Sequence, residues 1–365
     1  MSRSLLPLLI LTAASLFQVT HRAVSAPMYT VANLGLFSVD GFNDAGQVVG
    51  TPYRSSVASV YQNGTFTALP AEFGYTVGIN NSGEIVGNSY LGTLDAQTGQ
   101  VTNVRQFTTA PPAVGGPDPG GPFLINSNGA VAYVSGNDAY LYQGGKTTDF
   151  AQFFPGSRIV PGPLNDAGQL VLEVIPLSGS GQNETTGTPK AYVYQGGKVQ
   201  AMPNNWNGVL GSGSNAQGQF VGSTGAPNSS LTGIVHAALY QNGQVTDLGT
   251  LGGDSSSAYG INSRGQVVGE SAVVNYIGTH AFLYQNGTMY DLNSMIPPIP
   301  GVTLEAAYRI NNQGQIVAAG QGPDGSWDTL LLTPVPSPVP EPGTLTVFVF
   351  IGGAIALRGF SHRKS

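Results

Sequence analysis

Two histidines are the first candidates for chemistry in this chain. His236 and His280 are the only histidines between residues 27 and 332, and an imidazole can act as a general base or bind a metal near neutral pH. Each begins a similar apolar segment, His-Ala-Ala or His-Ala-Phe, in neighbouring copies of one repeat. Because equivalent repeat positions share a structural role, we interpret both as structural. The chain has no cysteine, so carboxylates would have to complete any metal site.

Three aspartates recur just before the end of a predicted strand: Asp149, Asp247 and Asp291. A glycosidase would need two carboxylates that meet across a site, whereas a carboxylate at a strand end commonly caps a turn. The repeated position favours capping. The chain also lacks an Asp-x-Asp-x-Asp-Gly calcium loop. The sequence therefore predicts no catalytic residue, no cofactor and no metal site.

A four-residue turn recurs along the chain. An Asx side chain at the first position and glycine at the last are typical of a type I turn. Successive asparagines are 37, 46, 39, 50, 47 and 49 residues apart, close to the length of a four-stranded propeller blade. The seven copies are Asn43/Gly46, Asn80/Gly83, Asn126/Gly129, Asn165/Gly168, Asn215/Gly218, Asn262/Gly265 and Asn311/Gly314.

A second turn lies between these copies and reads Tyr-Gln followed by Asn-Gly or Gly-Gly. Two residues that tolerate positive φ predict a type I′ hairpin. The second unit carries a longer turn at 95–99 instead. The tyrosines could stack on carbohydrate, but their common position favours a packing layer between units. They are Tyr61, Tyr142, Tyr194, Tyr240 and Tyr284.

The repeat is clearest in 236–269, where it predicts four strands, which we call a to d. The chain starts at 29–34 with a segment like strand b and ends at 327–332 with a segment like strand a. Pairing of these two segments would close the array and remove both exposed edges. We therefore predict an all-β fold over 27–332, a seven-bladed β-propeller of four-stranded units.

The connections of this unit fall at two ends. The a–b and c–d turns share one end, the turn face, and are short. The b–c and d–a connections share the other end, the loop face, and include long segments at 108–121, 176–189, 222–233 and 270–279. Variable loops on a rigid scaffold commonly carry binding, so we expect recognition at the loop face.

Charge argues against one class of partner. Residues 27–340 contain 8 Lys/Arg and 18 Asp/Glu, a net charge of 8 − 18 = −10. Nucleic acid binding needs a basic surface, so we expect no nucleic acid partner. Charged residues are only 9% of the chain, well below the roughly 25% of typical domains, while alternating apolar residues favour a folded β protein.

Both ends of the chain read as export signals. Residues 1–26 combine Arg3, an apolar run and a Val-Ser-Ala site, which predicts a signal peptide cleaved between Ala26 and Pro27. Residues 333–342 form a proline-rich spacer. Residues 343–365 contain a short apolar segment, predicted as a helix, and a basic end. The apolar run 345–357 is short for a stable membrane span.

The C-terminal end resembles the PEP-CTERM sorting tail. The matching positions are Val339, Pro340, Glu341 and Pro342, then the apolar run, then the basic residues Arg358, Arg363 and Lys364. The resemblance implies export by the Sec machinery, transient membrane contact through the apolar helix, and processing by an exosortase. It also implies delivery to the cell surface or extracellular matrix of a Gram-negative bacterium.

The body is similar to HAF-type extracellular repeats. The resemblance rests on His280-Ala-Phe282, Asp247-Leu-Gly-Thr-Leu-Gly-Gly253 and Gly260-Ile-Asn262, and it is strongest in the fifth and sixth units. That family brings no established activity to the chain.

Together these features predict a surface-sorted structural or adhesive protein that contacts exopolysaccharide or another surface polymer through its loop face. The alternative is a secreted polysaccharide-acting enzyme, hydrolase or lyase, with carboxylates in the propeller channel. A third hypothesis is periplasmic retention by an uncleaved tail.

Overall fold

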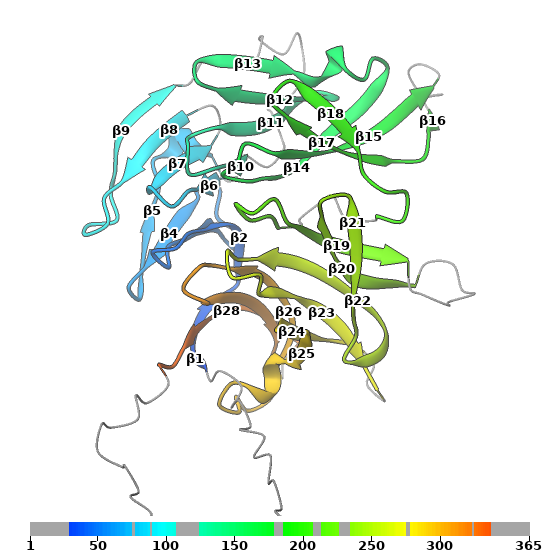
Figure 1. The fold of residues 1–365 in the computed structure, drawn as a ribbon. Helices are drawn as coiled ribbons and strands as arrows, with labels where there is room; N and C mark the ends of the chain where they lie inside the picture. Colours follow the sequence, from blue (N-terminus) through cyan, green and yellow to red (C-terminus); the bar gives the residue numbers. More distant parts are fainter. Residues whose placement is uncertain are drawn as a thin grey trace, which may run out of the picture.

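The computed structural model describes residues 29–336, apart from 75–76, 88–89, 107–123, 179–184, 207–212, 226–233, 275–277 and 323–324. These residues form seven antiparallel sheets arranged around a central axis, as predicted (Figure 1). Both predicted end segments, 1–26 and 343–365, lie outside the described residues. No helix within the described part is long and apolar enough to cross a membrane.

The first three blades follow one plan, in which the chain starts at the axis and moves outward strand by strand. Blade 1 contains β2 (Phe37–Phe42), β3 (Val48–Pro52), β4 (Ser59–Gln62) and β5 (Thr65–Ala68). Blade 2 contains β6 (Val77–Ile79), β7 (Glu84–Gly87), β8 (Tyr90–Leu94) and β9 (Val101–Gln106). Blade 3 contains β10 (Leu124–Ile125), β11 (Val131–Ser135), β12 (Asp138–Gln143) and β13 (Lys146–Asp149).

The next three blades keep this order with local variation. Blade 4 contains β14 (Ser157–Leu164), β15 (Leu170–Ser178), β17 (Lys190–Gln195) and β18 (Lys198–Ala201), with β16 (Thr185–Thr186) beside β15. Blade 5 contains β19 (Phe220–Gly225), β20 (Val235–Gln241) and β21 (Gln244–Gly249), with isolated Ser214–Phe220 and Trp206–Thr224 bridges on the inner side of β19. Blade 6 contains β22 (Gly252–Ile261), β23 (Val267–Val273), β24 (Thr279–Gln285) and β25 (Thr288–Asp291).

Blade 7 joins the two ends of the chain. It contains β26 (Thr303–Ile310), β27 (Ile316–Gln321), β28 (Trp327–Pro334) and, outermost, β1 (Tyr29–Gly35). The register pairs Tyr29 with Pro334 and Val31 with Leu332, and a bulge follows Asn33. The predicted closure of the ring by the first and last segments is therefore confirmed.

One part of the sequence interpretation is wrong. We described 236–269 as one four-stranded unit, but β20 and β21 belong to blade 5 whereas β22 and β23 belong to blade 6. Each blade thus runs c-d-a-b from the axis outward. The assignment of connections to the turn face and the loop face is unchanged by this correction. The b–c connection now joins two blades, but it still lies at the loop face together with the d–a connection. The 3-10 helices η1 (Ala71–Phe73), η2 (Phe150–Gln152) and η4 (Leu292–Ser294) occur in such b–c connections.

The second strand of each blade is apolar on both sides because it lies between two neighbouring blades. Val48 packs in a cluster shared with blade 7, while the next residue, Val49, packs in a cluster shared with blade 2. Val267 and Val268 divide in the same way between the clusters that join blade 6 to blades 5 and 7. Burial between blades therefore replaces a single central core.

The tyrosine layer predicted between units is present. Tyr240 contacts Phe220 and Trp206 within a cluster that also contains Val171 of the preceding blade. Each tyrosine of the Tyr-Gln turns belongs to, or packs against, a cluster shared with the preceding blade. A packing role is therefore confirmed for Tyr61, Tyr142, Tyr194, Tyr240 and Tyr284.

Candidate functional site

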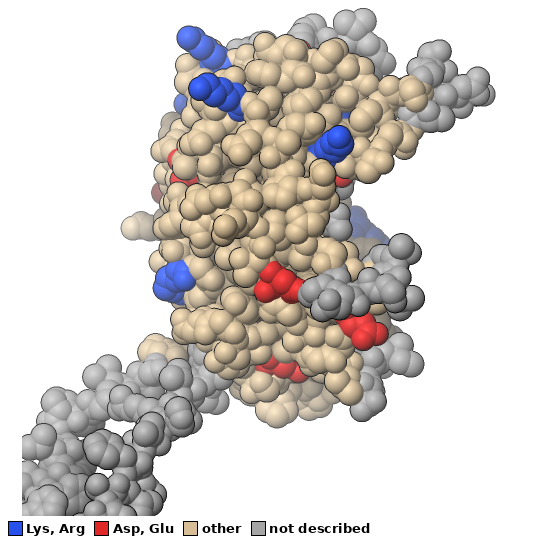
Figure 2. All heavy atoms as spheres, turned by 45° about the vertical axis from the view of Figure 1, so that its right-hand side comes forward, with Lys and Arg blue, Asp and Glu red and all other residues tan. Residues whose placement is uncertain are grey.

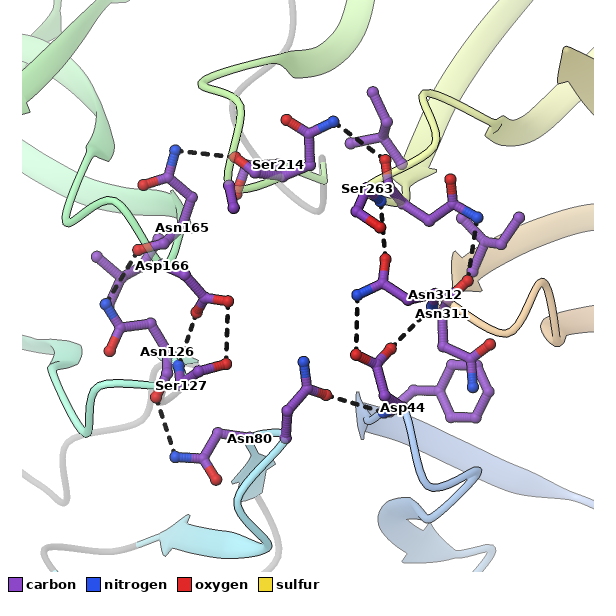
Figure 3. A pocket seen from close by; sticks show the side chains of 18 of the residues that line it. Asp44, Asn80, Asn126, Ser127, Asn165, Asp166, Ser214, Ser263, Asn311 and Asn312 are labelled. Carbon is purple, nitrogen blue, oxygen red and sulfur yellow. Dashed lines mark hydrogen bonds between the residues drawn. The ribbon is translucent and has the colours of Figure 1, made fainter.

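The seven Asn-x-x-Gly turns meet around the axis and form a closed circle of hydrogen bonds, which we call the asparagine ring. Figure 3 shows the part of this ring that lines the cavity. Each asparagine is buried, and its Nδ2 donates to the backbone carbonyl of the equivalent asparagine in the next blade over 3.0–3.1 Å. Asn311 of blade 7 donates to Asn43 of blade 1 and completes the circle. The ring thus ties every blade to the next.

The same asparagines also hold their own turns. Asn43 Oδ1 accepts the backbone N–H groups of Ala45 and Gln47 at 3.1 and 3.0 Å, and Gly46 N donates to the Asn43 carbonyl at 3.1 Å. The glycines that end the seven turns have φ between +72° and +82°. The Asx turn and terminal glycine predicted from the sequence are therefore confirmed.

A radial chain of amides extends outward from the ring. Asn262 Nδ2 donates to Gln266 Oε1 at 2.7 Å, and Gln266 Nε2 donates to Gln285 Oε1 at 2.8 Å. Gln285 belongs to the Tyr-Gln hairpin, whose Asn286 and Gly287 have φ of +51° and +78°, as a type I′ turn requires. Equivalent amide chains occur at Asn43-Gln47-Gln62, Asn165-Gln169-Gln195 and Asn215-Gln219-Gln241.

Glycine two positions before the ring asparagine allows neighbouring inner strands to approach. A Cβ on Gly41 would lie 2.9 Å from Ile79 N of the next blade, and a Cβ on Gly260 would lie 3.2 Å from Ile310 N. Blade 7 carries Arg309 at this position. Burial lowers the pKa of Arg309, and the negative charge of Asp40 in blade 1 opposes that shift.

The ring surrounds a cavity of about 220 Å³ that opens on the turn face, which we call the turn-face mouth. Residues preceding the asparagines form a mainly apolar wall: Phe42, Ile79, Ile125, Leu164, Ser214, Ile261 and Ile310. Residues following them form a polar wall: Asp44, Asn81, Ser127, Asp166, Ala216, Ser263 and Asn312. The sequence analysis did not predict this second set as part of a site. A polar residue follows six of the seven asparagines, and this regularity could have indicated a shared polar surface.

Two carboxylates line the mouth from opposite sides (Figure 3). Asp44 accepts the N–H and Nδ2 of Asn312 at 2.8 Å each. Asp166 accepts the N–H and hydroxyl of Ser127 at 2.7 and 3.0 Å. Asp44 belongs to blade 1 and Asp166 to blade 4, so three steps around the ring separate them. The carboxylates thus also link neighbouring blades.

The two histidines do not reach the mouth. His236 Nδ1 lies 2.9 Å from Asp247 Oδ2, and His280 Nδ1 lies 2.7 Å from Asp291 Oδ2, each across an a–b strand pair. The described residues contain no group of three or more His, Cys, Asp or Glu placed to hold a metal. The arrangement therefore gives each histidine a cross-strand partner in its own blade.

The strand-end aspartates act as caps, as predicted. Asp149 accepts the N–H of Ala151 at the start of η2 at 2.9 Å, and Asp291 accepts that of Asn293 at the start of η4 at 2.8 Å. Asp247 Oδ1 accepts Gly249 N at 2.7 Å. Each carboxylate thus binds a backbone N–H two residues on, where the chain leaves strand b for the next blade.

Charge is sparse on the surface. Figure 2 shows one side of the molecule, where Lys, Arg, Asp and Glu are few among uncharged residues. Four exposed large apolar residues of the described part lie at the loop face, where the d–a and b–c connections begin or end: Leu36, Tyr53, Val274 and Trp327. Four others among the described residues lie on strands or near the turn face: Phe66, Val104, Tyr308 and Val335.

The predicted processing residues lie outside the described part of the chain. Ala26 and Pro27 precede it, while Val339, Pro340, Glu341, Pro342, Arg358, Arg363 and Lys364 follow it. The structure does place the strands that lead to them. Tyr29, which starts β1, and Pro334, which ends β28, are cross-strand partners. A Cβ on Gly314 of a ring turn would be 3.4 Å from Pro334, so both strand ends lie at the turn face.

The strand order and the pairing of β1 with β28 define a closed seven-bladed β-propeller. No protein-family model matches the chain, and no curated protein sequence matches it significantly.

Several solved structures share the general arrangement at low identity. The β-propeller domain of the Trilobed protease from Pyrococcus furiosus has a TM-score of 0.49 at 8% identity, over 82% of this chain and 93% of that one. YCF48 from Cyanidioschyzon merolae has a TM-score of 0.45 at 12% identity, over 83% and 98%. An acylaminoacyl peptidase from Pyrococcus horikoshii has a TM-score of 0.41 at 11% identity, over 83% of this chain and 46% of that one.

Proposed function

We propose that the protein is an exported binding component of the cell surface that contacts exopolysaccharide or another surface polymer through its loop face. The observation that carries the proposal is the division between the two faces. The ends of β1 and β28 lie at the turn face, while the exposed side chains of Leu36, Tyr53, Val274 and Trp327 lie at the loop face, beside the strand ends that flank its connections. A tail held at a surface would point the loop face outward.

The junction of blades 7 and 1 offers the best contact surface on that face. Trp327 begins β28 with 44% of its area exposed, and Tyr53 follows β3 with 63% exposed. Tyr53 N donates to the Leu36 carbonyl at 2.9 Å, and Thr329 Oγ1 donates to the Phe37 carbonyl at 2.5 Å. Exposed aromatic rings with polar tips suit stacking on sugar rings.

The proposed export and processing of the protein are argued from its two terminal sequences. The Sec machinery would remove the leader after Ala26, and an exosortase would process the tail near Pro340-Glu341-Pro342. Mass spectrometry of the exported protein tests this directly. We expect no peptide that contains Arg363 and Lys364, and recovery of that peptide from the mature protein would instead support retention by an uncleaved tail.

Binding is tested with a glycan array and the chain 27–336. We expect binding to polysaccharide fragments without release of shorter products. Trp327→Ala and Tyr53→Ala should each weaken binding about tenfold, the effect of losing about 1.4 kcal/mol. Val104→Ala removes an exposed apolar side chain from outer strand β9 and should leave binding unchanged. Equal loss in all three variants would contradict a loop-face site, and product release would favour the alternative enzyme.

A further inference from the structure

A second ligand site, on the face opposite the loops, follows from the geometry of the turn-face mouth. We propose that this cavity binds a single neutral or amino hexose unit, such as the end of a saccharide chain. The proposal is independent of the loop-face function, because its residues lie at the other end of the propeller.

The cavity has the size of a one-ring site. Its volume of about 220 Å³ lies below the roughly 300–1,000 Å³ of sites that enclose drug-sized ligands. Its wall continues around the whole axis, since all seven blades contribute to it. A ligand there would contact every blade without separating any of them.

Several polar groups of the mouth remain available. Asn81 Oδ1 accepts the Asp44 N–H at 2.8 Å, whereas its Nδ2 has no partner among the described residues. The hydroxyls of Ser214 and Ser263 likewise have none in the described part of the chain, although Ser263 N donates to Asn312 Oδ1 at 2.8 Å. These groups can donate hydrogen bonds to a ligand.

The carboxylates supply acceptors beside these donors. An ionised carboxylate offers about four lone-pair sites, and each oxygen of Asp44 and Asp166 receives one of the protein hydrogen bonds described above. Spare acceptor capacity therefore remains. Because those bonds also fix the orientation of both side chains, the acceptors are held in place before a ligand arrives.

The hydrogen-bond donors, the carboxylate acceptors and the apolar wall of the mouth together favour a sugar over other small ligands. Hydroxyl groups need both donors and acceptors, and the C–H faces of a pyranose ring suit the isoleucine and leucine wall. A divalent cation prefers six or more converging oxygen ligands, whereas the two carboxylates come from blades three steps apart. An anionic sugar would be repelled by Asp44 and Asp166, and no Lys or Arg among the described residues lines the cavity.

Ligand-observed NMR and calorimetry with methyl hexosides test the proposal on the chain 27–336, which contains the whole closed ring. We expect saturable binding of at least one neutral or amino hexoside and at least tenfold weaker binding of the matching uronate. Absence of binding at about 10 mM hexoside, a concentration that would reveal even a Kd in the millimolar range, would overturn the proposal, as would preference for the uronate.

Three variants locate the binding. Ala216→Phe places a ring in the mouth from an exposed position that lines it and should abolish binding. Asn81→Asp keeps the acceptor oxygen but removes the free donor, and Ser263→Ala removes one hydroxyl; each should weaken binding several-fold. Gln313→Ala is the control, because its exposed side chain lies on a ring turn outside the cavity. Unchanged melting temperatures show that the ring is intact, and unchanged affinity in Ala216→Phe would refute the assignment.

Discussion

Asn311 Nδ2 lies 3.0 Å from the Asn43 carbonyl oxygen, although 268 residues separate the two asparagines in sequence. This bond is the seventh of the asparagine ring and the only one that joins the end of the described chain to its beginning. It acts at the axis, while the β1–β28 ladder joins the same two blades at the perimeter. Blades 7 and 1 are therefore joined both at the axis and at the perimeter of the propeller.

Loss of the closing asparagine should weaken the whole fold. Asn311→Ala removes donors to Asn43 and Gln315 and leaves the N–H groups of Gln313 and Gln315 without their acceptor. Orphaned buried polar groups cost about 1–3 kcal/mol each, so we expect a loss of roughly 2–4 kcal/mol in urea unfolding. Gln313→Ala, at an exposed position of the same turn, should cost much less; equal losses in the two variants would contradict a structural role for the asparagine ring.

Glycine on the second strand should tolerate no side chain. A Cβ on Gly269 would lie 2.0 Å from the Ser257 carbonyl oxygen, so Gly269→Ala should force the β22–β23 ladder apart and cost roughly 2 kcal/mol or more. A Cβ on Gly225, at the end of β19, would have no atom of the described residues within 4 Å. Gly225→Ala should therefore be nearly neutral in the same thermal unfolding measurement, and similar melting points for the two variants would contradict the packing argument.

A disulfide across the closure should form readily. Thr30 and Thr333 are direct cross-strand partners, which places their Cα atoms within the range that a disulfide spans. The chain has no cysteine, so a Thr30→Cys, Thr333→Cys double variant can form only this bond within one molecule. Because the bond closes a loop of nearly the whole propeller, oxidation should add up to about 5 kcal/mol.

The oxidised and reduced forms of that double variant provide the comparison. We expect a higher melting temperature for the oxidised form and none of this gain in the single variant Thr30→Cys. Failure of the thiols to pair, measured by thiol titration in the folded state, would mean that β1 does not lie on β28.

Alkaline titration should report on the same closure. Burial raises the pKa of Tyr29 to about 12, from the ordinary value of 10. The folded pKa exceeds the unfolded one, so this contribution to stability is complete below pH 10 and is lost as the pH rises toward 12. Tyr29→Phe should remove it, so the stability difference between variant and parent should change between pH 10 and 12. A constant difference across that window would show an exposed phenol.

Most of the fold could be predicted from the residues of the turns. Seven Asn-x-x-Gly turns gave the blade number, and the unmatched strands at 29–34 and 327–332 gave the closure. The blade boundary could not be derived in this way, because the sequence repeat has the same period whichever strand is taken first. Only the tertiary pairing places β21 and β22 in different sheets.

The asparagine ring itself was only partly visible in the sequence. We assigned each asparagine to its own turn, a role that aspartate would also fill. All seven positions are nevertheless asparagine, and aspartate lacks the Nδ2 donor that reaches the next blade. The uniform amide was thus a signal for a contact between blades, but its target lies about one repeat away in sequence and could not be inferred from local chemistry.

The β1–β28 pair also determines how the molecule responds to force. Tyr29 and Pro334 are partners at one end of an antiparallel ladder, so tension between the two chain ends would open that ladder rung by rung, as in unzipping. Tension that enters along a strand direction would load many hydrogen bonds at once. A propeller tethered by one end and pulled through its loops would therefore resist detachment better than one pulled by both ends.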